Sequence, residues 1–186
     1  KEIVLASKIA GPNPNFGYMR EQLDFSPASI KYALDNSLQR LQTDYLDVYQ
    51  LHWPERKNNC FGQRGFKVQE DGWEDNIHQV LEALDGFVKE GKIKHVGLSN
   101  ETPWGIMRFL EESKYRNLPR IKTVQNPYSL LNRLFEVGSS EVCMRENVGL
   151  LAYSPLAFGV LSGKFLTSES HPNARLSLIS SVFQIQ

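Results

Sequence analysis

The sequence predicts an α/β protein with a parallel sheet, and two observations lead to this prediction. Short apolar segments rich in β-prone residues alternate five times with longer segments whose apolar residues recur at helical spacing. No tight-turn signal separates two of the strand-like segments, so we predict no β-hairpin. Strands that alternate with helices are joined by right-handed crossovers and therefore lie parallel in one sheet.

Two architectures contain such a sheet. A (β/α)8 barrel needs roughly 250 residues, so a chain of 186 residues is enough for about five of its eight units. The alternative is an open, doubly wound sheet, but the Gly-x-Gly-x-x-Gly sequence that usually follows its first strand is missing.

The first predicted strand and helix occupy the N-terminal part of the chain. Ile3–Ile9 is a mostly apolar run, which is typical of a strand buried on both faces. Ser26 is the expected N-cap of the helix, and Pro27 suits its first position. The apolar face of this helix is expected to consist of Ile30, Leu34, Leu38 and Leu41.

The second predicted strand starts at Leu46 and ends at His52 or Trp53, because Pro54 cannot donate a backbone hydrogen bond to a sheet. The polar segment Glu55–Asn76 shows no periodicity, and a long loop after a strand is where a barrel places substrate-binding elements. The alternative is a surface insertion. The aromatic residues expected to help Trp53 shape a substrate pocket are Phe61, Phe66 and Trp73.

The second half of the chain repeats the alternation. Its predicted helices are a stripe from Ile77 to Val88 that stops at Gly91, a helix that starts at Thr102 and Pro103, and Glu141–Asn147. Its predicted strands are Ile93–Asn100, Ile121–Asn126 closed by Pro127, and Gly149–Pro155, followed by a loop over Leu156–Lys164.

Charge and composition exclude several classes of protein. The 21 basic and 21 acidic residues cancel, which argues against a general nucleic-acid or membrane-surface binder. No apolar run of about 18 residues exists, and the first residues are too charged for a secretory signal. Cys60 and Cys143 lie far apart without metal-site spacing, so we expect free thiols, no metal site and a cytoplasmic location.

Polar side chains occur where each apolar strand segment stops. They are Lys8, His52, Ser99 and Asn100, Gln125 and Asn126, and Tyr153 and Ser154. Ligands bind at the carboxyl ends of the strands in parallel α/β proteins. The sequence therefore predicts one shared ligand site at these strand ends.

The residue types indicate what such a site binds. A lysine at a buried strand end either forms a Schiff base or lowers the pKa of a neighbouring acid. Ser99, Asn100 and Gln125 offer the donors and acceptors that grip a planar amide such as the carboxamide of nicotinamide. Tyr153 suits stacking on a flat ring, and the loop after it offers backbone N–H groups and Lys164 to a phosphate.

Each assignment has a simpler structural alternative. Lys8 is then a solvated or ion-paired lysine, and His52 caps its strand by hydrogen bonding to nearby backbone. Asn100 and Thr102 are then helix caps, and Tyr153 is ordinary core packing.

At these residues the sequence resembles the aldo-keto reductases, in particular the bacterial branch similar to potassium-channel β subunits. Five motifs carry the resemblance, occur in the family's order and span nearly the whole chain. They are Ala6-Ser7-Lys8, Tyr45-Leu46-Asp47 with Leu51-His52-Trp53-Pro54, Gly91-Lys92-Ile93 through Gly97-Leu98-Ser99-Asn100, Val124-Gln125-Asn126-Pro127-Tyr128, and Tyr153-Ser154-Pro155-Leu156-Ala157 through Ser162-Gly163-Lys164.

The resemblance implies a partial (β/α)8 TIM barrel in which residues 1–186 form a single incomplete domain, roughly strands three to seven of eight. It implies that Lys8 and His52 are two of four catalytic residues, and that the family's tyrosine and aspartate come from upstream segments not present in this chain. In the family, hydride passes from NADP(H) to a carbonyl carbon. The tyrosine, its pKa lowered by the lysine, protonates the oxygen, while the histidine orients and polarises the carbonyl.

The resemblance also implies the cofactor contacts. Ser99, Asn100 and Gln125 match the residues that hold the carboxamide, and Tyr153 matches the ring-stacking aromatic residue. Lys164 and Arg175 are expected near the adenosine 2′-phosphate, which would favour NADP(H) over NAD(H). The loop over the pyrophosphate is matched by Ser154, Pro155, Leu156, Ala157, Phe158, Gly159 and Lys164.

Three functions follow from these features. The first is an NADP(H)-dependent oxidoreductase that reduces small aldehydes or ketones to alcohols, with the chain as given lacking the proton donor. The second is a non-catalytic, cofactor-binding regulatory or partner-binding subunit. The third is a barrel lyase or aldolase in which Lys8 forms a Schiff base, which the cofactor-type residues Gln125 and Tyr153 disfavour.

Overall fold

The fold is built on a single parallel sheet. The structure is a computed structural model that describes residues 3–13, 16–20, 22–59, 65, 68, 70–166 and 171–179. Within these residues, the strands lie in the order β1-β2-β3-β4-β5, and each neighbouring pair is parallel. They are β1 (Ala6–Ile9), β2 (Leu46–Leu51), β3 (Ile93–Ser99), β4 (Ile121–Pro127) and β5 (Gly149–Tyr153).

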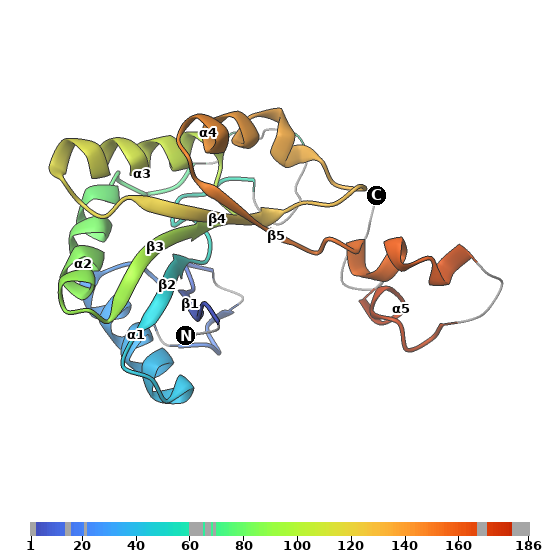
Figure 1. Cartoon of the computed structure of the whole chain (residues 1–186), viewed down its shortest axis with the longest axis horizontal. Helices are drawn as coiled ribbons and strands as arrows, with labels where there is room; N and C mark the ends of the chain where they lie inside the picture. Colours follow the sequence, from blue (N-terminus) through green and yellow to red (C-terminus); the bar gives the residue numbers. More distant parts are fainter. Residues whose placement is uncertain are drawn as a thin grey trace.

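Helices connect consecutive strands and cover one face of the sheet (Figure 1). They are α1 (Pro27–Leu41), α2 (Ile77–Lys89), α3 (Pro103–Arg116) and α4 (Ser139–Arg145). In a barrel the chain order of the strands equals their spatial order, whereas a doubly wound sheet reverses that order at a switch point. The described residues therefore confirm the α/β class and form part of a (β/α)8 barrel.

Two helix starts follow from caps that the sequence predicts. The Ser26 hydroxyl accepts a hydrogen bond from the backbone N–H of Ser29 at 3.3 Å. The Thr102 hydroxyl accepts one from the N–H of Gly105 at 3.2 Å. A proline follows each cap, where its missing N–H leaves no hydrogen bond unmade.

The core lies between the sheet and the helices. Successive strand residues point to opposite faces, and Leu51, Leu98 and Val124 point to the helices with at most 3% of their surface exposed. Leu34 of α1 and Ile106 of α3 are fully buried against the same core. The alternate residues of each strand face away from the helices, and they carry the polar groups of the site.

The first strand differs from its prediction. The run Ile3–Ile9 becomes a strand only at Ala6, and Ile3 and Val4 are 67% and 74% exposed. The expectation of burial on both faces is wrong, because helices cover one face and β1 pairs only with β2 among the described residues. Leu41, expected on the buried face of α1, is the last residue of that helix and is 43% exposed.

Several further boundaries shift by one or two residues. The strand expected to end at His52 or Trp53 is β2, which ends at Leu51, and the strand expected over Ile93–Asn100 is β3, which ends at Ser99. Pro127, expected to close the fourth strand, is its last residue, and β5 ends at Tyr153, before Ser154 and Pro155. The helix expected over Glu141–Asn147 is α4, which starts two residues earlier, at Ser139.

Two observations concern the described residues as a whole. Cys143 is a buried free thiol, as predicted, whereas Cys60 lies outside the described residues. None of the described helices has the length and apolar character that a bilayer crossing requires.

Candidate active site

The carboxyl ends of the strands bring together side chains from distant parts of the sequence. Paired residues of a parallel ladder point to the same face, and so do alternate residues of one strand. The register of the sheet therefore places one group of predicted site residues on the face turned away from the helices. This group is Lys8, His52, Ser99, Gln125 and Tyr153.

His52 and Lys8 are neighbours at the ends of β2 and β1. The backbone N–H of His52 donates to the carbonyl of Ile9 at 2.9 Å, which continues the parallel ladder one residue beyond β2. Burial, and then the nearby Lys8 ammonium, lower the pKa of His52 to about 4. Burial also lowers the pKa of Lys8. His52 is therefore neutral near neutral pH and has one ring N–H to donate.

Asn100 connects the ends of three strands. Its backbone lies in the left-handed region, with φ of 54°, which asparagine tolerates better than most residues. Its Nδ2 donates to the His52 carbonyl at 2.9 Å and to the Ser99 hydroxyl at 3.2 Å. Its Oδ1 accepts from the Tyr153 hydroxyl at 2.6 Å. The helix cap of α3 is Thr102, so the capping alternative holds for Thr102 and not for Asn100.

Gln125 lies beside this centre on β4. The Ser99 hydroxyl donates to the backbone carbonyl of Gln125 at 2.9 Å. The Gln125 side chain is half-buried, and its amide makes no hydrogen bond within the part of the chain that the structure describes. An amide combines an acceptor with two donors, so Gln125 retains the set that a bound carboxamide needs.

A tight turn follows β5. Ser154, Ala157 and Phe158 have positive φ of 55°, 46° and 57°, values that residues with a Cβ adopt infrequently. The N–H of Ala157 donates to the carbonyl of Ser154, and that of Gly159 to the carbonyl of Leu156, both at 2.9 Å. These two N–H groups stabilise the turn itself. The turn contains the predicted residues Ser154, Pro155, Leu156, Ala157, Phe158 and Gly159.

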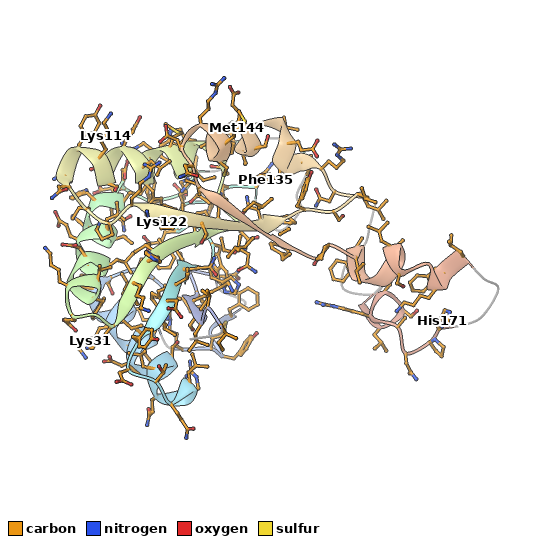
Figure 2. The ribbon with its side chains drawn as sticks, in the orientation of Figure 1. Lys31, Lys114, Lys122, Phe135, Met144 and His171 are labelled. Carbon is orange, nitrogen blue, oxygen red and sulfur yellow. The ribbon has the colours of Figure 1, made fainter. Side chains whose placement is uncertain are left out.

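Lys164 and Arg175 reach the same turn. The Lys164 side chain folds back over Gly159, where a Cβ would lie 3.0 Å from Nζ. The Arg175 guanidinium lies over the Phe158 ring, 4.9 Å from its centroid. The ring Nε2 of His171, labelled in Figure 2, donates to the Lys164 carbonyl at 2.8 Å and holds this segment on the turn. The two predicted cations therefore meet at Phe158 and Gly159.

Sequence reasoning missed an ion pair beside the site. Arg56, four residues after His52, pairs with Glu101, the residue after Asn100. The only sequence signal is weak: two opposite charges that each follow closely on a strand ending in a predicted site residue.

Two buried amides have surroundings that the sequence did not show. Asn126, predicted among the strand-end residues, points to the helix side and brackets the backbone of Glu101. Its Oδ1 accepts from the Glu101 N–H at 3.2 Å, and its Nδ2 donates to the Glu101 carbonyl at 2.9 Å. Gln50 pairs with Lys8 in the sheet register and is 1% exposed. Its Oε1 has no hydrogen-bond partner among the described residues.

The expected aromatic lining is partly described. Trp53 is 5% exposed, and its ring centroid lies 4.7 Å from that of His52. Trp73 packs edge-on against Trp104, with ring centroids 6.3 Å apart. Together with Trp53 it lines a cavity whose walls include Leu51 and Leu98, so this cavity lies on the helix side of the sheet and not on the face that carries Lys8 and His52. The other two aromatic residues lie outside the described residues; they are Phe61 and Phe66.

Comparisons with known proteins show what the chain as a whole is similar to. Protein tas of Escherichia coli is 46% identical over 181 residues, which are 97% of this chain and 52% of that protein. A Babesia bovis protein named aldo-keto reductase is 40% identical over 177 residues, 89% of this chain and 62% of that protein. A Schizosaccharomyces pombe protein named aldo-keto reductase yakc [NADP(+)] is 29% identical over 173 residues, 92% of this chain and 44% of that protein.

The chain thus spans about half the length of the curated relatives it matches. The family model described as "Aldo/keto reductase family" matches residues 1–178. That match covers more than half of the chain, and it includes the five strands and every predicted site residue. The chain therefore belongs to the aldo/keto reductase family.

Proposed function

We propose that the intact protein is an NADP(H)-dependent oxidoreductase that reduces aldehydes or ketones to alcohols. The observation that carries the proposal is the arrangement at one sheet face. Lys8 and His52 lie together at the ends of β1 and β2, and the half-buried amide of Gln125 lies two strands further along the same face. Lys8 and His52, which suit a substrate carbonyl, therefore lie on the same face as Gln125, which suits the carboxamide of a nicotinamide.

The residues of this chain suit the nicotinamide end of such a cofactor. Gln125 supplies an amide for the carboxamide, and Asn100 fixes the hydroxyl end of Tyr153, whose ring would cover one face of the nicotinamide. Family membership and the relative named for NADP(+) support this assignment. When bound, the cofactor supplies the hydride that the carbonyl carbon accepts.

His52 and Lys8 would then act on the substrate oxygen. A neutral His52 donates a hydrogen bond to the carbonyl oxygen, which orients it and polarises the bond. The oxygen takes up one proton as the carbon takes up hydride, so the product is an alcohol. Lys8, as a cation, lowers the pKa of a neighbouring acid, which we propose to be the family's tyrosine; no residue of this chain is assigned that role.

The turn after β5 would hold the phosphates. Lys164 and Arg175 converge on Phe158 and Gly159, and two cations at one turn suit the extra 2′-phosphate of NADP(H). We therefore propose that Lys164→Met and Arg175→Met weaken binding of NADPH and leave that of NADH nearly unchanged.

Turnover tests the proposal directly. Purified intact protein is mixed with NADPH and a panel of small aldehydes and ketones, and NADPH loss is followed by absorbance, with Lys8→Met as the inactive control. We expect turnover with at least one carbonyl compound and a preference for NADPH over NADH. Binding of NADPH without turnover of any compound would instead support a non-catalytic, cofactor-binding subunit. Absence of NADPH binding would overturn both readings.

We further propose a cytoplasmic location, consistent with the predicted free thiols.

A further inference from the structure

A buried ion pair joins the loop after β2 to the start of α3. The side chains of Arg56 and Glu101 are 12% and 3% exposed. Nη1 of Arg56 donates to Oε2 of Glu101 at 3.2 Å, and Nη2 donates to Oε1 of the same carboxylate. Nη2 also donates to the Thr102 hydroxyl, at 3.1 Å. The guanidinium also lies over the Trp104 ring, 4.8 Å from its centroid.

Stability alone does not account for this pair. Removing two charges from water costs several kcal/mol per ion, which their attraction offsets only in part, and apolar residues of similar size often stabilise a fold as well or better. The first turn of α3 also accommodates the pair with a glycine, although glycine disfavours helix. A Cβ on Gly105 would lie 2.1 Å from Oε1 of Glu101 and 2.4 Å from Nη2 of Arg56.

The ion pair lies next to the backbone that determines the orientation of the Asn100 side chain. Glu101 follows Asn100 directly, and Asn126 brackets its backbone through two hydrogen bonds of 3.2 and 2.9 Å. Arg56 belongs to the segment that starts at His52, whose carbonyl accepts from Asn100 Nδ2. The Asn100 hydrogen bond and the ion pair therefore connect the same two segments at two points.

We propose that Arg56 and Glu101 are positioning residues for Asn100, and that they set the orientation in which the nicotinamide is held. The pair fixes the left-handed turn at Asn100, so that Nδ2 meets His52 and Oδ1 meets Tyr153. This inference rests on the proposed function, because the nicotinamide is the ligand of that function.

The test compares Arg56→Met and Glu101→Gln with a matched control, Arg108→Met, in the intact protein. Arg108 is a partly buried arginine that ties α3 to the loop before α2, through Asp75 at 2.9 Å, and it also pairs with Glu111 and Glu112. Its loss imitates a purely structural defect without touching Asn100. The double variant Arg56→Met with Glu101→Gln leaves no unpaired buried charge and separates stability from positioning.

Two cofactor measurements report the positioning. Affinity is measured for NADPH and for adenosine 2′,5′-bisphosphate, which lacks the nicotinamide. The face of hydride transfer is measured with two NADPH samples, each deuterated at one of the two hydrogens on C4 of the nicotinamide. We expect Arg56→Met, Glu101→Gln and the double variant to weaken NADPH binding about tenfold and adenosine bisphosphate binding less than about twofold. Hydride transfer loses its strict preference for one face, and Arg108→Met matches wild type in both measurements.

The inference fails if NADPH and adenosine bisphosphate weaken equally, if Arg108→Met behaves like Arg56→Met, or if hydride transfer stays specific for one face. A readout without cofactor separates this failure from failure of the proposed function. The side-chain amide of Asn100, observed by NMR in the free protein, should shift and lose exchange protection in Arg56→Met and remain as in wild type in Arg108→Met. An unchanged Asn100 amide overturns the positioning role even if wild type binds no NADPH. Absent NADPH binding with a changed amide overturns the proposed function, and with it the nicotinamide as the ligand, but leaves the positioning of Asn100 by the pair standing.

Discussion

The Tyr153 hydroxyl donates a 2.6 Å hydrogen bond to Asn100 Oδ1, from the end of β5 to the end of β3, with β4 between the two strands. This bond skips the neighbouring strand, so sheet pairing does not explain it. It fixes the ring of Tyr153 and the amide of Asn100 relative to each other, at the place where we propose the nicotinamide binds.

Substitution at Tyr153 separates this bond from stacking. Tyr153→Phe keeps the ring and leaves Asn100 Oδ1 without its donor, so we expect NADPH affinity to fall about threefold to tenfold, as for one lost hydrogen bond. Tyr153→Ala also removes the stacking surface and should weaken affinity further. Equal affinity of both variants, measured by quenching of NADPH fluorescence, would contradict a stacking role.

His52 should make stability depend on pH in the acidic range. Its folded-state pKa of about 4 lies below its ordinary value of 6.5. The unfolded chain therefore binds the proton first, and stability that is full above pH 6.5 falls as pH drops towards 4, with a slope of at most about 1.4 kcal/mol per pH unit. Urea unfolding of wild type and His52→Gln across this range measures the slope, which the variant should lack. A slope unchanged by the substitution would show that another group is responsible.

Lys8 contributes the smaller of the two causes that lower the pKa of His52. In Lys8→Met the pKa of His52 should rise and yet stay below its ordinary value, because burial of the ring persists. An NMR titration of the His52 ring protons measures it. A pKa that fell or did not move would contradict the electrostatic influence of Lys8 on His52. The same variant should lose turnover.

Two glycines in helices should respond in opposite ways to alanine. At Gly86 of α2, a Cβ would meet no described atom within 4 Å beyond its own helix and adjoining residues, so Gly86→Ala should stabilise by about 0.5–1 kcal/mol. At Gly105 a Cβ displaces the Arg56–Glu101 pair, so Gly105→Ala should destabilise despite the better helix former. Urea unfolding of both variants decides the point, and stabilisation by Gly105→Ala would mean that the pair moves aside at little cost.

The fold was largely readable from the sequence because its signals are local. The signals are the alternation of strand-like and helix-like apolar patterns, the N-caps Ser26 and Thr102, and the proline after each cap. Each signal depends only on nearby residues, and the strands and helices form where these signals lie. The first strand was predicted too long: Ile3 and Val4 are apolar and β-prone, yet both are exposed, and β1 begins only at Ala6.

The sequence by itself determined which residues stand at the strand ends: Lys8, His52, Asn100, Gln125 and Tyr153 each follow or end an apolar run, and parallel strands end at one edge. Only the tertiary structure decided how these residues are held. Asn100 meets both His52 and Tyr153, Asn126 turns to the other face, and Arg56 meets Glu101 across 45 positions of chain. Such contacts depend on strand register and on the path of two loops in space, and no local pattern in the sequence encodes either of them.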